Sequence, residues 1–261
     1  MLMFKNQRQN EILEMLAKEK FISVNTLAER LYASLPTVRR DLTTLENAGL
    51  VKRCHGGVML YEGRESTPVS FRQGKQTGEK LKMARHAVRL IQDGDLIFLD
   101  SSSSVLHIAD FLGGFKDITV VTNGLIAAKK LSEAGVGVFS TGGRLLVESS
   151  ALVGQLAERA LAEFNADVMF FSAAALSMTG EISDWSEDER NMRRAMAKTA
   201  TTKVFICDSS KLDKKCSYRF GSLLDVDYIV TDKSLPDEFS PKVTLISDAE
   251  DDAYLYKINK E

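Results

Sequence analysis

The chain has 261 residues, of which 44% are apolar and 27% charged, a composition that excludes extended disorder. No apolar run approaches the roughly 20 residues that a membrane span needs, and residues 1–9 lack a signal peptide's apolar core, so we expect a cytoplasmic protein without a membrane partner. Nine Lys or Arg against six Asp or Glu give residues 1–60 a net charge of +3, whereas the remainder holds 25 against 30 and carries −5. A DNA-binding module on an acidic body has this charge distribution.

The cysteines and histidines are few and widely spaced. They form no C-x-x-C pair and no cluster with metal-ligand spacing, so the sequence predicts neither a disulfide framework nor a metal site. We expect reduced thiols and no cofactor. The residues concerned are Cys54, Cys207, Cys216, His55, His86 and His107.

Apolar residues at helical spacing predict two short helices near the start of the chain, separated by a break at residues 21–23. A third helix is predicted from Ser34, whose hydroxyl can cap the first turn, with Pro36 at a position that needs no N–H donor. We expect Gly49 at its C-terminal cap. The predicted buried positions of the three helices are Ile12, Leu13, Leu16, Leu27, Ala28, Leu31, Val38, Leu42 and Leu45.

The opposite face of the third helix carries hydroxyl and guanidinium groups, at Thr37, Arg40 and Thr44, with Arg39 on its flank. Arginine can pair with the O6 and N7 atoms of guanine, and hydroxyl groups can bind phosphates, so this face suits a DNA major groove. The alternative is a solvated face whose arginines are neutralised by Asp41 and Glu46. The helix alone does not separate the two readings.

The next segment, "LVKRCHGGVML" at residues 50–60, predicts a strand, a Gly-Gly turn and a second strand. Arg53 and His55 would lie on this hairpin beside the third helix. Three helices and a basic hairpin form a winged helix-turn-helix, which we assign to residues 1–58. Residues 59–78 lose apolar periodicity and predict a linker, followed by a larger domain at residues 79–261.

Residues 8–58 resemble the DNA-binding domain of the DeoR-type bacterial repressors, most clearly in "TVRRDL", in the "L..AGL" that follows and in "HGGV". The resemblance implies double-stranded operator DNA as a partner. It further implies that Ser34, Thr37, Arg39 and Arg40 face DNA, with Arg53 and His55 on the wing.

Beyond residue 79, predicted strands and helices alternate, which indicates an α/β domain with a mainly parallel sheet covered on both faces. Helices are expected at 79–91, 105–112, 124–132, 155–164 and 187–201. Strands are expected at 95–100, 118–123, 136–141, 167–172, 203–208, 228–232 and 243–247.

Polar residues follow several of these strands, where ligands bind in such sheets. The clusters are Asp100 with Ser101 to Ser104, Thr122 with Asn123 and Gly124, Thr141 with Gly142 and Gly143, and Asp208 to Lys211. Loop amides and the start of the 105–112 helix could hold an anion. Lys211 and Arg144 could neutralise a phosphate, while Asp100 and Asp208 could accept hydrogen bonds from ligand hydroxyls. A small phosphorylated sugar would satisfy both sets.

The larger domain also resembles the DeoR-type family, whose effector domain has the fold of ribose-5-phosphate isomerases. "GDLIFLDSSSS", "VVTN", "STGGRL", "SSALVG" and "CDSSKL" follow the family's landmarks in order. The resemblance implies sugar-phosphate contacts from residues 101–104, 122–124 and 142–143, and from Gly154 and Lys211. Two segments depart from the family: "SSSS" replaces a Ser-Gly-Thr-Thr loop, and "FFSAAALSMTGE" replaces a Gly-rich segment with an acid.

Three functions are compatible with this organisation. We expect a non-catalytic regulator, a repressor of a carbohydrate-metabolism operon whose operator binding responds to a phosphorylated sugar. A sugar-phosphate isomerase with a DNA-binding appendage would need a carboxylate base, but alanines occupy the place of the acidic loop and nearby acids read as a helix start. A constitutive DNA-binding protein would not need the polar loops. A homodimer or homotetramer is expected, because one head recognises few base pairs.

Overall fold

The computed structural model describes residues 5–19, 21–47, 50–54, 56–60, 69–74, 76–247 and 253–260. The chain divides into two compact units, Met1–Gly74 and Lys75–Glu261. The predicted linker at 59–78 therefore spans the division, and part of it is helical, since α4 covers Val69–Gly74. None of the described helices is long and apolar enough to cross a bilayer.

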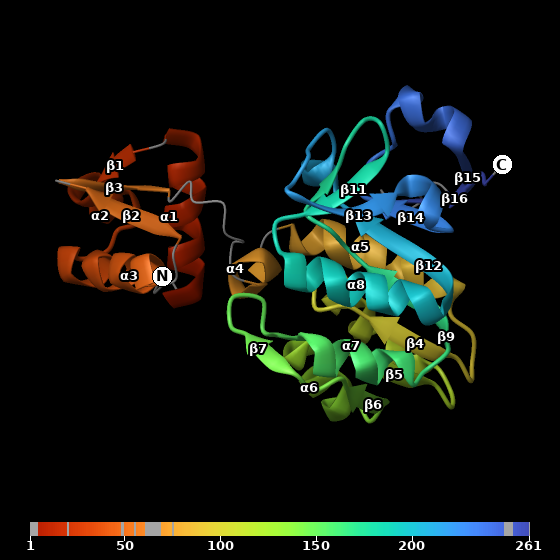
Figure 1. Cartoon of the computed structure of the whole chain (residues 1–261). Helices are drawn as coiled ribbons and strands as arrows, with labels where there is room; N and C mark the ends of the chain where they lie inside the picture. Colours follow the sequence, from red (N-terminus) through yellow and green to blue (C-terminus); the bar gives the residue numbers. More distant parts are fainter. Residues whose placement is uncertain are drawn as a thin grey trace. The chain divides into compact units, whose positions relative to one another are not determined.

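Unit 1 contains the three predicted helices and the hairpin, α1 (Lys5–Glu19), α2 (Val24–Arg30), α3 (Leu35–Asn47), β2 (Val51–Cys54) and β3 (Gly57–Leu60) (Figure 1). The apolar positions chosen from helical spacing form one core, in which Ile12, Leu16, Leu27, Val38 and Leu42 have no exposed surface. Burial of these stripes is what makes such short helices stable, because isolated helices of this length are marginal in water.

The segment predicted as a break is instead a strand. β1 (Phe21–Ser23) pairs antiparallel with β3, giving a three-stranded sheet in the order β1-β3-β2. Ile22 enters the core from this strand, and the Ser23 hydroxyl caps α2 by accepting a hydrogen bond from the Thr26 N–H at 3.0 Å. Gly49, the expected cap of α3, lies outside the described residues.

Unit 2 is built on an eight-stranded sheet in the order β15-β16-β14-β12-β9-β4-β5-β6. The strands from β14 to β6 in this order are parallel, and β16 is antiparallel to both of its neighbours. The bounds of these strands are β4 Leu96–Leu99, β5 Thr119–Thr122, β6 Gly137–Ser140, β9 Ala166–Phe171, β12 Ala200–Cys207, β14 Tyr228–Thr231, β15 Val243–Ser247 and β16 Tyr254–Ile258.

Side chains of alternate residues in the central strands pack into two separate cores, one on each face of the sheet. α5 (Thr77–Ala87) and α6 (Leu125–Glu133) contribute to one core, with Ile97, Val120 and Val204 from the strands. α7 (Gln155–Ala162) and α8 (Glu187–Thr199) pack on the other, with Phe98, Val121 and Phe205. The mainly parallel α/β domain is thus confirmed, with helices covering both faces (Figure 1).

Two differences from the predicted elements matter for function. The expected helix at 105–112 is a pair of short 3₁₀ segments, η2 (Leu106–Asp110) and η3 (Leu112–Gly114), so it cannot supply the dipole of a full α-helix to an anion. A second, small antiparallel sheet was not predicted because β11 and β13 mix polar and apolar residues and contain no apolar run. It consists of β10 (Ala175–Leu176), β11 (Glu181–Asp184) and β13 (Tyr218–Ser222).

Candidate nucleic-acid interface and candidate anion-binding site

The face of α3 opposite the core is exposed and polar, as its spacing predicts. Ser34, Arg39, Arg40 and Thr44 are exposed and Thr37 is half-buried, whereas Val38 and Leu42 have no exposed surface. The Ser34 hydroxyl caps the helix, accepting from the Thr37 N–H at 3.4 Å and lying 2.8 Å from the Thr37 hydroxyl oxygen. The Thr44 hydroxyl donates to the Arg40 carbonyl at 3.0 Å. Hydroxyl and guanidinium groups are therefore presented together on one surface.

The acids that could have neutralised this face are engaged elsewhere. Asp41 is 1% exposed and accepts hydrogen bonds from Arg8 Nε at 2.6 Å and Gln9 Nε2 at 3.1 Å. A Glu46 carboxylate oxygen accepts from the backbone N–H of Arg53 at 3.2 Å. Among the residues that the structure describes, no acid pairs with Arg39 or Arg40. Their positive charges remain available to an anionic partner such as DNA phosphate.

The wing is formed by β2 and β3, with Gly56 at φ +81 in the turn between them. The Arg53 side chain is exposed on β2, beside the exposed residue Lys52. His55 lies outside the described residues.

In unit 2, the central strands β4 and β9 pair in parallel. The next strand of the sheet after β4 is β5, on one side of this pair, and the next after β9 is β12, on the other side. Such a switch point is where ligands bind in open α/β sheets. Asp100 follows β4 and joins the two strand ends: it accepts from the N–H groups of Ser102 at 2.9 Å and Ser172 at 3.1 Å, and from Arg193 Nε at 2.8 Å. Because three protein donors occupy its oxygens and it is 2% exposed, Asp100 positions the loop instead of facing a ligand.

The serine loop, Ser101 to Ser104, follows Asp100 and contacts Lys211, which lies in the short 3₁₀ segment Ser209–Lys211 after β12. Lys211 Nζ donates to Ser104 Oγ at 3.1 Å and to Ser172 Oγ at 2.6 Å. Ser102, Ser103 and Ser104 are buried, and Ser101 is half-buried. No residue of the loop has a positive φ, so serine fits where the family has glycine. The loop and Lys211, 107 residues apart, are thus brought together as predicted.

A second lysine at this loop was not predicted. Lys80 on α5 is 3% exposed, and its Nζ donates to Ser103 Oγ at 3.3 Å. A signal was present in the sequence, because Lys80, Met83, Ala84 and Ala87 stand at i, i+3, i+4 and i+7 on the buried stripe of the helix. A lysine on an apolar stripe marks a buried cation that needs a polar partner.

Asp208 contributes the counter-charge of this cluster. It lies 3.3 Å from Lys211 Nζ and accepts from the Ser210 N–H at 3.1 Å. Burial acts to raise the pKa of Asp208, but the charge of Lys211, the hydrogen bonds from Ser210 and Lys211, and the charge of Lys80 lower it below its ordinary value. Two ammonium groups therefore converge on the serine loop, and Asp208 pairs directly with Lys211.

The end of β5 lies against the serine loop. A Cβ atom on Gly124 would be 3.0 Å from the Ser101 Cα, so this close approach favours glycine. Thr122 is buried, and its hydroxyl accepts from the Gly124 N–H at 3.0 Å. Asn123 Nδ2 donates to the Leu152 carbonyl at 3.1 Å, while its Oδ1 is buried without a hydrogen-bond partner among the described residues. A ligand hydroxyl could satisfy this acceptor.

The remaining predicted residues lie on other turns and strands of the domain. Gly142 and Gly143 form the turn between β6 and β7 (Arg144–Leu146), and Gly154 caps α7 with φ +91 after β8 (Ala151–Val153). The Arg144 side chain is 61% exposed and pairs with Asp188 at 2.6 Å. The structure therefore directs Arg144 to the first turn of α8, whereas Lys80 is the second cation at the serine loop.

We expect Gly143→Ala to lower the free energy of unfolding by about 1–3 kcal/mol, because φ is +111 and a Cβ would lie 2.7 Å from the Val153 carbonyl oxygen. Urea unfolding followed by Trp185 fluorescence measures this change. Gly114→Ala is the control, since Gly114 has open space for a Cβ and no positive φ. Equal unfolding midpoints for the two variants would contradict the strain argument.

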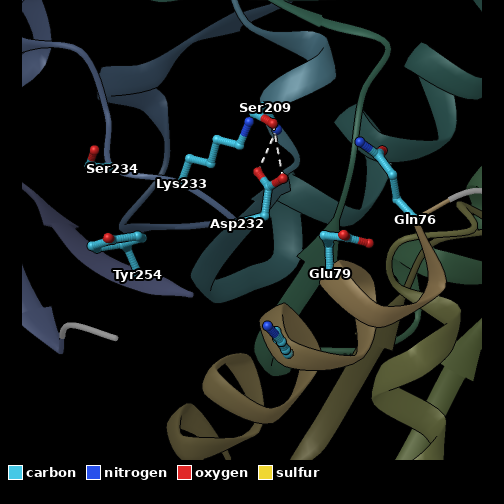
Figure 2. Close-up of a pocket in the computed structure, with 8 residues that line it drawn as sticks. Gln76, Glu79, Ser209, Asp232, Lys233, Ser234 and Tyr254 are labelled. Atoms are coloured by element: carbon cyan, nitrogen blue, oxygen red, sulfur yellow. Dashed lines mark hydrogen bonds between the residues drawn. The ribbon is translucent and has the colours of Figure 1, made fainter. Parts of the chain in front are cut away.

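A pocket of about 500 Å³ is lined by residues close in sequence to Lys80 and Lys211 (Figure 2). Glu79 and Ser209 line it, and each is within two residues of a clustered lysine. Within the pocket wall, Ser209 donates to both carboxylate oxygens of Asp232, from its N–H at 2.6 Å and from its hydroxyl at 2.9 Å. The other lining residues are Gln76, Lys82, Lys233, Ser234 and Tyr254.

The acids that could serve as the carboxylate base of an isomerase form ion pairs with arginines. Asp184 is 5% exposed and bonds to Arg193, Asp188 pairs with Arg144, and Glu187 lies 3.0 Å from an Arg190 nitrogen. Burial acts to lower the pKa of Arg193, but the charges of Asp184, Asp100 and Glu189 raise it overall, so its guanidinium stays charged between them. Asp184, Asp188 and Glu187 are therefore each paired with an arginine of the same domain.

Comparison with known proteins agrees with both units. Residues 8–63 match the model of the DeoR-like helix-turn-helix domain, and residues 75–233 match the DeoR C-terminal sensor domain. The chain is 32% identical over 235 residues to the transcriptional regulator GolR of Listeria innocua, covering 89% of this chain and 92% of that protein. It is 31% identical over 228 residues to the transcriptional repressor AccR of Agrobacterium fabrum, covering 86% and 88%.

Among solved structures, ribose 5-phosphate isomerase A from Methanocaldococcus jannaschii is 16% identical, with a TM-score of 0.41 over 70% of this chain and 80% of that chain. This likeness is distant, and the named sequence relatives are transcriptional regulators, not enzymes. With a DeoR-like helix-turn-helix followed by a DeoR sensor domain, this chain belongs to the DeoR family of transcriptional regulators.

Proposed function

We propose that this protein represses a carbohydrate-metabolism operon and that a phosphorylated sugar controls its binding to operator DNA. The observation that carries the effector assignment is the meeting of Lys211, Lys80 and the serine loop at the carboxyl ends of β4 and β12. Ammonium and hydroxyl donors at one point suit a phosphate monoester. The repressor assignment is supported by family membership and by the exposed basic face of α3.

The proposed DNA contacts combine base reading with phosphate binding. Arg40 would read base edges in the major groove, while the other residues would bind phosphates or the adjacent groove. The set comprises Ser34, Thr37, Arg39, Arg40, Thr44, Arg53 and His55.

The proposed effector contacts divide by chemistry. The phosphate would be held by Lys80, Lys211 and the hydroxyl and N–H groups of Ser103 and Ser104. Sugar hydroxyls would be recognised by Asn123 Oδ1, the acceptor that is left without a described partner. The turns at Thr122, Gly124, Gly142, Gly143 and Gly154 would shape the site, with Asp100 and Asp208 orienting its donors.

Regulation would follow from a homodimer or homotetramer in which the effector prefers one arrangement of the subunits. Binding of operator and effector is then reciprocal, so each changes the affinity of the other by the same factor. The protein would act in the cytoplasm, where sugar phosphates are formed.

A thermal-shift screen against a panel of sugar phosphates tests this proposal. A ligand present at about 100 times its Kd stabilises the native state by about 2.7 kcal/mol, which raises the Tm of a domain of this size by about 5–10 °C. The matched unphosphorylated sugars are the controls and should produce no shift. A panel in which no phosphorylated compound raises the Tm more than its parent sugar would refute the effector assignment.

A further inference from the structure

The first turn of α5 begins without a side-chain cap, although Glu79 in this turn is favoured by the helix dipole. Gln76 precedes the helix at φ +50 and makes no side-chain capping hydrogen bond, and Gly78 lowers helix stability. Residues 76–79 are exposed, whereas Lys80 is 3% exposed. A turn of this kind opens easily, so its order depends on how firmly Lys80 is held.

One side of this turn also faces open space. Gln76 and Glu79 line the pocket of about 500 Å³, which lies between the start of α5 and residues near the ends of β12 and β14 (Figure 2). Packing against β14 and β12 therefore does not fill this side of the turn. The Lys80 side chain instead connects the first turn of α5 to the serine loop.

The Lys80 side chain ends at the proposed phosphate site. Lys80 Nζ donates to Ser103 Oγ at 3.3 Å, and the next residue, Ser104, accepts from Lys211 at 3.1 Å. The N–H groups of Ser103 and Ser104 donate to no residue in the described part of the chain. A dianionic phosphate on these donors would add a charge-assisted bond to each lysine and so hold Lys80 more firmly.

We infer that phosphate bound at the serine loop orders the first turn of α5 through Lys80, a step that rests on the proposed function. Unit 1 ends at Gly74 and α5 begins at Thr77, so this turn is where the chain of the DNA-binding unit joins the sensor domain. Occupancy of the effector site thereby changes the order of the helical turn that follows the DNA-binding unit along the chain. A ligand that changes local order in this way couples two sites without a large structural change.

Hydrogen exchange on the full-length protein, with and without inorganic phosphate at matched ionic strength, tests the inference. Phosphate should slow amide exchange by about fivefold or more in residues 77–84 and also in residues 101–106. In Lys80→Met, with phosphate raised until residues 101–106 are again protected, the effect on residues 77–84 should fall below about twofold. Lys129→Met, which removes a lysine of α6 that is 76% exposed and pairs with Glu133, should behave as the wild type.

Each result decides a different claim. Protection of residues 77–84 that persists in Lys80→Met, or protection of residues 101–106 without any effect on α5 in the wild type, overturns the inference and leaves the phosphate site standing. Absence of protection in both segments of the wild type removes the phosphate site itself. The Tm of each variant without phosphate shows that it is folded.

Discussion

Arg40→Ala should weaken binding to the operator by about 1–3 kcal/mol, or about 5- to 150-fold, and relax base preference at one position of each half-site. Arg40 is exposed on the face of α3 opposite Val38 and Leu42, and no acid in the described residues pairs with it. Its guanidinium group therefore breaks no ion pair with a described acid when it binds a guanine. The measurement is fluorescence anisotropy on a fragment that the purified protein selects from random DNA.

The matched control is Arg159→Ala, which removes an exposed arginine from α7 in the sensor domain. That variant should retain the wild-type Kd. A variant at Arg40 that binds as tightly as the wild type, with unchanged base preference, would remove this residue from base recognition. Equal weakening on every sequence, with a shallower salt dependence, would instead assign Arg40 to phosphate contact.

Lys211→Met should abolish the rise in Tm that a sugar phosphate produces, because it deletes the ammonium group that lies between Ser104, Ser172 and Asp208. A hydrogen bond to a charged group contributes about 1.5–3 kcal/mol, and loss of Lys211 also leaves Asp208 without its cation. Effector affinity should fall by at least about tenfold. Isothermal titration with the compound that gives the largest thermal shift measures it.

Lys215→Met provides the comparison, since Lys215 is nearby in sequence but 71% exposed and paired with Glu181. It should keep the full thermal shift. Operator affinity without effector should be unchanged in both variants, because neither lysine lies in the helix-turn-helix unit. An undiminished thermal shift in Lys211→Met would place the phosphate elsewhere on the domain.

The sequence by itself determined which faces are buried and which ends of strands are polar. Val38, Leu42 and Leu45 are buried in α3 and Arg40 is exposed, because helical periodicity places apolar residues on one face. Likewise, the parallel strands bring the serine loop and Lys211 to one edge of the sheet, as their positions after strands predict. Both properties depend on local pattern and on the connection rules of α/β folds.

Only the tertiary structure decided which charged groups meet. Asp100 was expected to face a ligand but is occupied by Arg193, 93 residues away, and Arg144 is turned toward Asp188. Lys80 enters the site because α5 packs next to the serine loop. A side chain's partner depends on distances between segments far apart in sequence, which local periodicity does not contain, whereas burial requires only a repeating apolar pattern.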